Sequence, residues 1–264
     1  MPDKMRAVDK MIALDKHPIT DTTWLAAQKS RLDKEGALVL SGFLNADALM
    51  ALQEEAEQGL AGAYFNPQTH NVYLRPSDPD FADDHIRNRP LLSSKGCICD
   101  DEIAEDSVLK QLYHHADFRA GLCAILGEEA LHPYADPLSS VNIHYARQGE
   151  ELNWHYDNSS FAVTLMISPA RAGGVFEYAR NIRNADQNEM GFEDTDALVS
   201  GRTKPQILDL QAGDLCLFRG RNSLHRVTPV EDESVRQLAV LAYNNSPGLA
   251  LSETARQTFY GRLN

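Results

Sequence analysis

The sequence predicts a mainly β protein with a helical flank, and three observations carry this prediction. Apolar residues recur at helical spacing between about residues 21 and 60, and again between about 105 and 126. From about residue 138 the period changes to two, where Val141, Ile143 and Tyr145 alternate with polar residues. No internal repeat or linker divides the chain. Helices followed by many short strands indicate one β core with helices packed beside it.

The first half of the chain contains clear start and stop signals. A helix is expected from Asp21 until Gly36 ends it, and residues 37–40 then predict a short buried strand. Asn45 is the expected N-cap of a second helix. Residues 61–100 contain four prolines and predict a long irregular cover over a functional site.

The second half predicts the β core. We expect a polar excursion over residues 181–203 between two of its strands. The whole chain, 1–264, is expected to be a single domain, with helical support and the cover loop in 1–130 and the β core in 131–250. Further strands are expected at 161–167, 174–178, 206–210, 214–218, 224–229 and 235–243.

Composition excludes several classes of protein. Lys and Arg number 25 against 38 Asp and Glu, for a net charge of −13, which argues against broad nucleic-acid or anionic-membrane binding. No apolar run reaches the length of a membrane span, and residues 1–20 form a polar lead-in without an apolar signal core. The four cysteines form no CxxC pair and predict reduced thiols. We therefore expect a cytoplasmic protein whose partner is a small molecule, and a homodimer is compatible with the sequence.

The segment Asn153–Asn158 carries the most informative motif. His155 and Asp157 are two residues apart, and at a strand end this spacing points both side chains the same way. An imidazole and a carboxylate together suit a divalent metal. His225 opens a strand 68 residues after Asp157, and an excursion of two strands can return it to the same place. An isolated His-x-Asp also occurs often by chance, so the combination carries the argument.

Two histidines and one carboxylate form the facial triad of non-haem Fe(II) oxygenases, and this triad leaves metal positions open. Arg236 follows His225 by 11 residues on a strand-like run. Its guanidinium can hold the distal carboxylate of 2-oxoglutarate through two parallel hydrogen bonds. A solvated strand arginine is the alternative.

At this point the chain resembles the Fe(II)/2-oxoglutarate-dependent oxygenases of the double-stranded β-helix, or cupin-like jelly-roll, fold. Within that family it is similar to the carrier-independent amino-acid halogenases and their lysine-hydroxylase relatives, over roughly residues 60–250. Ile86 stands where that subgroup suggests proline. The supporting segments are Trp154–Ser159, Gly173–Tyr178, Ile182–Arg183, Tyr134–Leu138, Asp78–Arg87 and the run from Gly213 to Arg236.

The resemblance implies roles for individual residues. Fe(II) would be held by His155, Asp157 and His225, with no catalytic residue beyond the iron centre and O2 as the co-substrate. Arg236, Asn142 and Thr228 are the candidates for binding 2-oxoglutarate; for Asn142, which shares a strand face with His144, a buried and satisfied amide is the alternative. The candidate substrate residues are Arg87, Arg89, Asn158, Trp154 and Tyr243. Trp154 is more often a core residue, and both loop arginines are equally well explained as solvated.

The carboxylate of Asp157 decides between halogenation and hydroxylation, the two reactions of the subgroup. In the halogenases a small residue replaces the aspartate, and chloride takes the vacant iron position, whereas Asp157 is present here. The expected reaction is therefore hydroxylation of an unactivated C–H bond of a small substrate, a free and basic amino acid, with release of succinate and CO2. The alternatives are desaturation, cyclisation or halogenation at the same iron, or a non-catalytic cupin-like metabolite-binding protein. A zinc hydrolase is disfavoured because no general base accompanies the motif.

Overall fold

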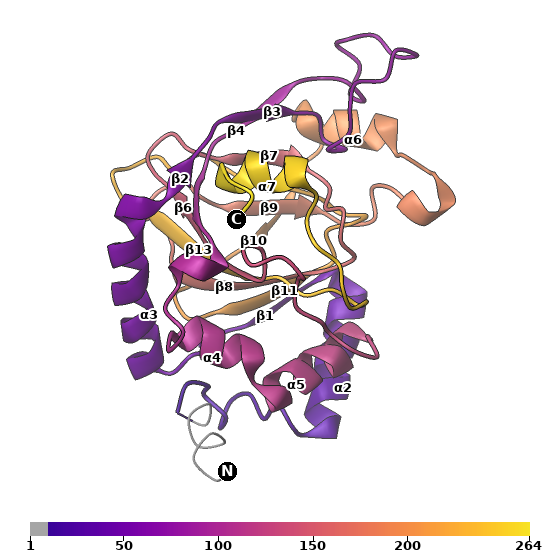
Figure 1. Cartoon of the computed structure of the whole chain (residues 1–264). Coiled ribbons are helices and arrows are strands. Elements are labelled where there is room, and N and C mark those ends of the chain that lie inside the picture. The colour runs from indigo at the N-terminus through magenta and orange to yellow at the C-terminus, as the bar shows by residue number, and fades with distance from the viewer. Residues whose placement is uncertain (1–9) are drawn as a thin grey trace.

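The computed structural model describes residues 10–264, so residues 1–9 of the expected polar lead-in lie outside the described part. Two antiparallel sheets face each other across a common interior (Figure 1). The larger sheet has seven strands in the order β1-β11-β8-β13-β6-β5-β2. Its strands are β1 (Ala37–Leu40), β2 (Tyr64–Phe65), β5 (Gly96–Ile98), β6 (Val141–Ala146), β8 (Ala162–Ser168), β11 (Leu215–Phe218) and β13 (Arg236–Leu241).

The smaller sheet has four strands in the order β10-β9-β12-β7, and its members come from the same second half of the chain. They are β7 (Leu152–His155), β9 (Phe176–Ala179), β10 (Gln206–Leu208) and β12 (Leu224–Val227). Apart from the neighbours β9 and β10, consecutive strands of the second half alternate between the two sheets, as in a jelly roll. The predicted double-stranded β-helix core is confirmed.

Four helices cover the outer face of the seven-stranded sheet. Asp21 and Asn45 accept hydrogen bonds from backbone N–H groups as N-caps, which confirms both predicted helix starts. Helix α3 contacts β8, and α4 contacts β6 and β13 (Figure 1). The helices on this face are α2 (Thr22–Glu35), α3 (Ala46–Gly59), α4 (Val108–His114) and α5 (Ala116–Leu126). The main hydrophobic core lies between them and the sheet, around Ile143, Leu165 and Leu217.

The outer face of the four-stranded sheet has a cover of its own. Trp154 and Leu224 pack there against Tyr73 and Ile86 of the 71–90 segment and against Leu198. Leu198 belongs to α6 (Phe192–Val199), which forms inside the expected 181–203 excursion. Both sheets thus have side chains packed against their outer faces, although β10 at the edge of the small sheet stays exposed.

Some elements differ from the sequence predictions. Residues 61–100 are not wholly irregular, because the short strands β2 and β5 extend the large sheet and β3 (Gln68–His70) pairs with β4 (Leu91–Ser93). With β1, they add strands from before residue 131 to the β core. The helices expected over 105–126 are α4 and α5, which meet at His115, the C-cap of α4 and the N-cap of α5. The sequence analysis did not foresee α7 (Glu253–Tyr260). The remaining elements are the short 3-10 helices η1 (Leu60–Gly62), η2 (Asp100–Glu102) and η3 (Ala185–Gln187).

Across residues 10–264, no helix combines the length and the apolar character needed to cross a membrane.

Core packing at β6 predicts a large loss of stability on truncation. Ile143 is fully buried between the sheet and its helices, whereas Ile207 of β10 is 66% exposed. Ile143→Ala should therefore lower the free energy of unfolding by about 2–5 kcal/mol. Ile207→Ala, the same chemical change, should alter it by less than about 0.5 kcal/mol. Urea denaturation followed by circular dichroism measures both, and equal losses would contradict this description of the core.

Candidate metal centre and active site

Two strands of the small sheet bring the predicted metal ligands together. β7 and β12 pair antiparallel with His155 directly opposite His225, and the ring centroids are 4.1 Å apart. Asp157 follows the end of β7, and its Oδ1 lies 3.7 Å from Nε2 of His155 and 3.6 Å from Nε2 of His225. The three ligand atoms lie within 4.8 Å of one another. This juxtaposition of two imidazoles and one carboxylate fits a divalent metal.

Backbone carbonyls orient both imidazoles in the same way. Nδ1 of His155 lies 2.8 Å from the carbonyl oxygen of Asn153, and Nδ1 of His225 lies 3.0 Å from that of Ser223. A carbonyl can only accept, so each Nδ1 carries a proton, which leaves Nε2 as the nitrogen available to a metal. The two Nε2 atoms face Asp157, as metal-binding histidines require.

A glycine makes room for the third ligand. A Cβ added to Gly220 would lie 1.8 Å from Oδ2 of Asp157, so the carboxylate rests directly against the backbone of Gly220. The N–H of Asp157 also donates to the Gly220 carbonyl at 3.2 Å. On the other side, Arg183 stacks over the Tyr156 ring at 4.1 Å and donates to the Asp157 carbonyl at 3.3 Å. The position of Asp157 is therefore fixed from two sides.

The protonation states of the triad suit metal binding. Burial, together with the charge of His225, lowers the pKa of His155 to about 3, so its imidazole is neutral at physiological pH. Burial alone would raise the pKa of Asp157, but His225, His155 and Arg183 lower it by more. A neutral imidazole and an ionised carboxylate are the forms that bind cations.

Arg236 lies at the start of β13 with its side chain inside the barrel. It is 5% exposed, and its Nε has no hydrogen-bond partner. Burial lowers the pKa of its guanidinium to about 10. A Cβ on Gly174 would lie 3.1 Å from its Cδ, so this glycine gives the side chain its space. A buried, unsatisfied guanidinium is costly unless an anion pairs with it.

The other two residues predicted to bind 2-oxoglutarate, Thr228 and Asn142, differ in whether they are free to bind a ligand. Thr228 lies beside the Arg236 cradle, where its Oγ1 accepts from the N–H of Val175 at 2.9 Å and its hydroxyl hydrogen stays available. Asn142 is instead committed within the fold: its amide donates to the carbonyls of Leu138 and Val141 and accepts from the hydroxyl of Tyr260 at 3.0 Å. The alternative of a buried, satisfied amide therefore describes Asn142.

Two predicted substrate residues lie away from the triad. Trp154 alternates with His155 along β7 and points into the core outside the small sheet, where Arg226 stacks on its ring at 4.7 Å. Tyr243 packs in the helix-covered core, stacked on Tyr113 at 4.3 Å, and donates its hydroxyl to the Tyr113 carbonyl. The alternation of strand side chains explains the position of Trp154. The structure does not bring either residue to the metal site.

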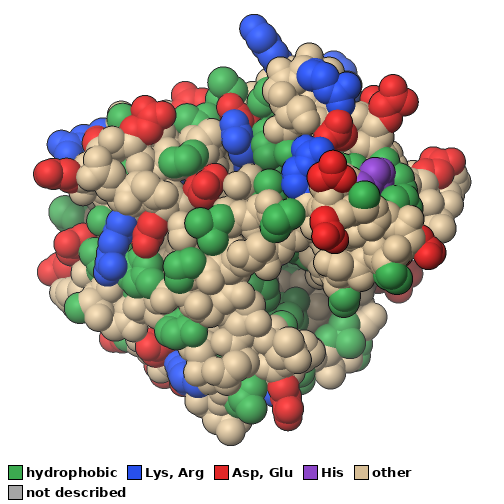
Figure 2. All heavy atoms as spheres, turned by 90° about the horizontal axis from the view of Figure 1, so that it is seen from above, with side chains coloured by type: hydrophobic (Ala, Val, Ile, Leu, Met, Phe, Trp, Pro, Cys, Tyr) green, Lys and Arg blue, Asp and Glu red, His purple; other side chains and the backbone are tan. Residues whose placement is uncertain are grey.

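The remaining candidate substrate residues differ in whether their side chains already have partners in the protein. Arg89 pairs with Asp196 of α6 at 2.7 Å and thereby fastens the 71–90 segment to that helix. Arg87 donates to the Pro76 carbonyl at 3.0 Å, and its nearest carboxylate, that of Asp78, is 3.8 Å away. Asn158 directly follows Asp157 and is exposed to solvent. Figure 2 views the molecule from above and shows a hollow on that face, near a group of acidic and basic side chains.

Sequence reasoning missed several neighbours of the site. His70 of β3 lies 6.4 Å from the ring of His155, centroid to centroid. Lys95 contacts His144 inside the barrel. His70 and Lys95 lie far from the triad in the sequence, so no local sequence pattern indicates that they are its neighbours. Gly220 was accessible to sequence reasoning, because it stands five residues before His225 in a turn.

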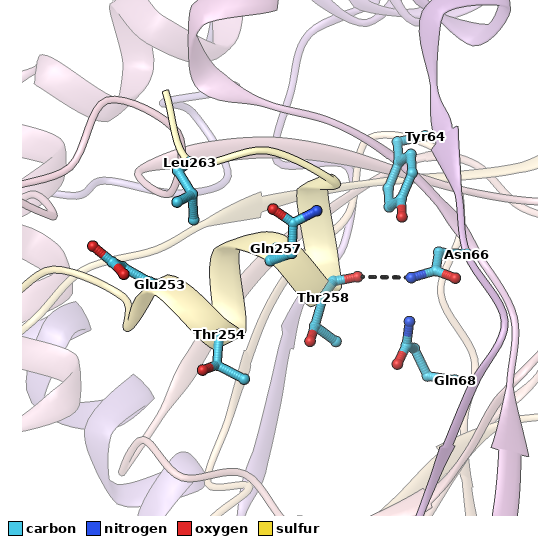
Figure 3. A pocket seen from close by; sticks show the side chains of 8 residues that line it. All are labelled: Tyr64, Asn66, Gln68, Glu253, Thr254, Gln257, Thr258 and Leu263. Atoms are coloured by element: carbon cyan, nitrogen blue, oxygen red, sulfur yellow. Dashed lines mark hydrogen bonds between the residues drawn. The ribbon is translucent and has the colours of Figure 1, made fainter.

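A cavity of about 530 Å³ lies elsewhere. It is bounded by residues 64–68 on one side and by α7 on the other, and the Asn66 side chain donates across it to the Thr258 carbonyl (Figure 3). Neither the triad nor Arg236 lines this cavity. Its size therefore gives no reason to move the candidate active site away from the triad.

Fold and site together define a jelly-roll protein of the Fe(II)/2-oxoglutarate oxygenase type. Residues 89–260 match the family model HalD, halogenase D, and the chain therefore belongs to the halogenase D family. No curated protein matches the chain.

Solved structures resemble the fold at low identity. A 2OG-Fe(II) oxygenase-family oxidoreductase from Burkholderia pseudomallei has 14% identity and a TM-score of 0.54, covering 85% of this chain and 92% of its own. A prolyl-4-hydroxylase from Pseudomonas putida has 16% identity and a TM-score of 0.51, with 82% and 96% coverage. The non-haem α-ketoglutarate-dependent epimerase SnoN from nogalamycin biosynthesis has 13% identity and a TM-score of 0.58, with 84% and 81% coverage.

The contact between Gly220 and Asp157 predicts a specific defect in metal binding. Gly220→Ala should displace the carboxylate and raise the Kd for Fe(II) by about 10-fold or more, as for other groups that orient metal ligands. Anaerobic calorimetric titration measures this Kd. Gly62→Ala is the matched control, because nothing lies within 4 Å of the added methyl group. Unchanged binding by Gly220→Ala would contradict the described position of Asp157.

Proposed function

We propose that the protein is an Fe(II)- and 2-oxoglutarate-dependent dioxygenase that hydroxylates a C–H bond of a small molecule. One observation carries the proposal: a complete triad with Asp157 in place shares the barrel with the unpaired Arg236. Membership of the halogenase D family supports the same iron chemistry. The presence of Asp157, which occupies the position that a halide needs, supports hydroxylation over halogenation.

The residues present fit both Fe(II) and the co-substrate. Three protein ligands on one side of a metal leave positions for a chelating 2-oxo acid and O2. Arg236 needs an anion inside the barrel, and 2-oxoglutarate has a carboxylate at its far end. Bound together, Fe(II) and 2-oxoglutarate supply the oxidising chemistry, with succinate and CO2 as co-products.

The protein contributes orientation and exclusion of water. The carbonyls of Asn153 and Ser223 hold the two imidazoles, and Gly220 holds the carboxylate. Phe176 stacks on the ring of His225, with centroids 5.6 Å apart, and Phe218 meets it edge-on at 4.8 Å. These aromatic rings make the metal side of the barrel apolar, which keeps water from the reacting centre.

For the substrate we propose a free amino acid, in line with the halogenase resemblance. Arg87 is the better candidate for its carboxylate, because Arg89 is already paired with Asp196. Asn158 is exposed beside Asp157 and is placed to meet a molecule that approaches the metal. A basic side chain on the substrate rests on the family resemblance alone.

A screen tests the reaction directly. The protein is incubated with Fe(II), 2-oxoglutarate, ascorbate and a panel of free amino acids and simple amines, and both succinate and product mass are measured. Gain of one oxygen atom identifies hydroxylation, whereas loss of two hydrogens identifies desaturation at the same iron. A chlorinated product would contradict the role given to Asp157. Absence of any substrate-stimulated 2-oxoglutarate turnover would favour a metabolite-binding protein.

Removal of the carboxylate ligand should stop the reaction. Asp157→Ala is expected to lower succinate formation by about 100-fold or more, since even groups that only orient a metal ligand contribute 10- to 100-fold. Asp209→Ala, which removes an exposed aspartate remote from the triad, is the control and should retain activity. Comparable activity in the two variants would exclude Asp157 as a ligand.

Arg236→Met should weaken binding of 2-oxoglutarate. Charge-assisted hydrogen bonds contribute about 1.5–3 kcal/mol, so the Kd should rise by about 10- to 100-fold. The charge-transfer absorption that forms on anaerobic addition of 2-oxoglutarate to the Fe(II) protein measures it. Arg171→Met removes a 76% exposed arginine side chain and should leave the Kd unchanged. If Arg236→Met binds as tightly as the wild type, the co-substrate lies elsewhere.

A further inference from the structure

A second cation lies inside the barrel and has no part in the triad. Nζ of Lys95 is 2.8 Å from Nδ1 and 3.2 Å from Nε2 of His144. Burial lowers the pKa of His144, and the charge of Lys95 lowers it further, so the imidazole is neutral and accepts a hydrogen bond from the ammonium group. Lys95 is therefore held in one direction by a neutral partner.

Strand register places Lys95 at the level of Arg236. Arg236 of β13 is opposite Ala146 of β6, and on the other side of β6 Gly96 is opposite Tyr145. Continuing that antiparallel register by one residue sets Lys95 beside Ala146. Because Cys97 is opposite His144, and Lys95 is two residues before Cys97, the Lys95 side chain shares the interior face of the sheet. Two cations thus flank the single methyl group of Ala146.

The level of Arg236 and Ala146 lies toward the opposite end of the barrel from Asp157. Asp157 packs on Gly220, which follows Phe218 at the end of β11, and Phe218 is opposite Ala162 at the start of β8. Near the opposite end of β8, Ser168 is the register partner of Gln237, the residue after Arg236. Asn158, next to Asp157, is exposed, whereas Arg236 is buried. Arg236 therefore lies toward the opposite end of the barrel from Asp157, and the strand register places Lys95 at the level of Arg236.

Neither cation has a carboxylate partner. Among the ion pairs of residues 10–264, none includes Lys95 or Arg236. Desolvation lowers the pKa of Lys95 to about 8; Cys97 opposes this shift, and the charge of Arg236 adds to it. A buried guanidinium and a partly buried ammonium group that lack carboxylate partners on one face of the sheet are complementary to a strongly anionic ligand.

We propose that Lys95, positioned by His144, is a second cationic contact for 2-oxoglutarate, so that a Lys–Arg pair recognises the dicarboxylate. The inference rests on the proposed function. In this arrangement Arg236 supplies planar, two-point binding, and Lys95, the residue before β5, supplies a point charge from the other side of β6. The pair selects dicarboxylic over monocarboxylic 2-oxo acids.

Anaerobic binding titrations of the Fe(II) protein test the proposal without turnover. The probes are 2-oxoglutarate and 2-oxopentanoate, which has the same chain length and lacks the second carboxylate. Lys95→Met should raise the Kd for 2-oxoglutarate by about 10- to 100-fold, as expected for loss of a charge-assisted contact. Its Kd for 2-oxopentanoate should stay within about twofold, and Lys95→Arg should recover part of the affinity for 2-oxoglutarate.

Two further variants separate a binding role from a structural one. Lys110→Met removes a buried lysine of α4 outside the barrel, where it pairs with Asp100 and Glu105, and should leave both Kd values unchanged. His144→Phe keeps Lys95 but removes its acceptor and should weaken 2-oxoglutarate binding less than Lys95→Met. Thermal melts establish folding, and Lys95→Gln replaces Lys95→Met if the latter does not fold.

The outcomes are distinct. Unchanged 2-oxoglutarate affinity in Lys95→Met, or equal weakening for both 2-oxo acids, would overturn the role of Lys95 while leaving the proposed function intact. An effect of Lys95→Met confined to the KM of the amino-acid substrate would also overturn it, because Lys95 would then bind substrate. Failure of the wild-type Fe(II) protein to bind 2-oxoglutarate at all would instead remove the proposed function.

Discussion

The antiparallel pairing of β7 with β12 is the constraint on which the site depends. It sets His155 opposite His225, and both imidazoles then donate Nδ1–H to a carbonyl two residues earlier in their own chain. A shift of one residue in this register would turn one histidine outward, because strand side chains alternate between faces. The same alternation sends Trp154 and Tyr156 into the outer core, and that core holds the register in place. One face of β7 thus carries a metal ligand, and its other face packs in the outer core.

The barrel interior concentrates unpaired charge at both of its levels. At the metal level, the carboxylate of Asp157 faces two imidazoles, and at the level of Ala146 Arg236 and Lys95 lack carboxylate partners. Burying such groups reduces stability unless a ligand compensates for them. A metal and a dianion supply the missing charges, so we expect ligand binding and fold stability to be coupled in this protein.

The cover over the small sheet links the site to two long excursions. Arg89 joins the 71–90 segment to α6 through Asp196, and Tyr73 donates to the Met190 carbonyl at 3.0 Å. Arg183, from the second excursion, reaches the backbone of Asp157. The segments that differ most between jelly-roll proteins therefore contact the metal-binding side directly. Substrate choice can thus change while the barrel stays the same.

The sequence by itself determined the helix starts, most strands of the β core and the triad, because caps, periodicity and the His-x-Asp spacing are local signals. It also singled out Arg236, which opens β13 in the large sheet after the chain leaves β12 of the small sheet. The sequence could not place Asn142, Trp154 or Tyr243, since the face that each presents depends on partners far along the chain. Only the tertiary structure set Gly220 against Asp157 and Lys95 beside His144. Each of these two contacts joins segments that are distant in the sequence. The strand register that brings them together depends on the whole fold, so no single segment predicts it.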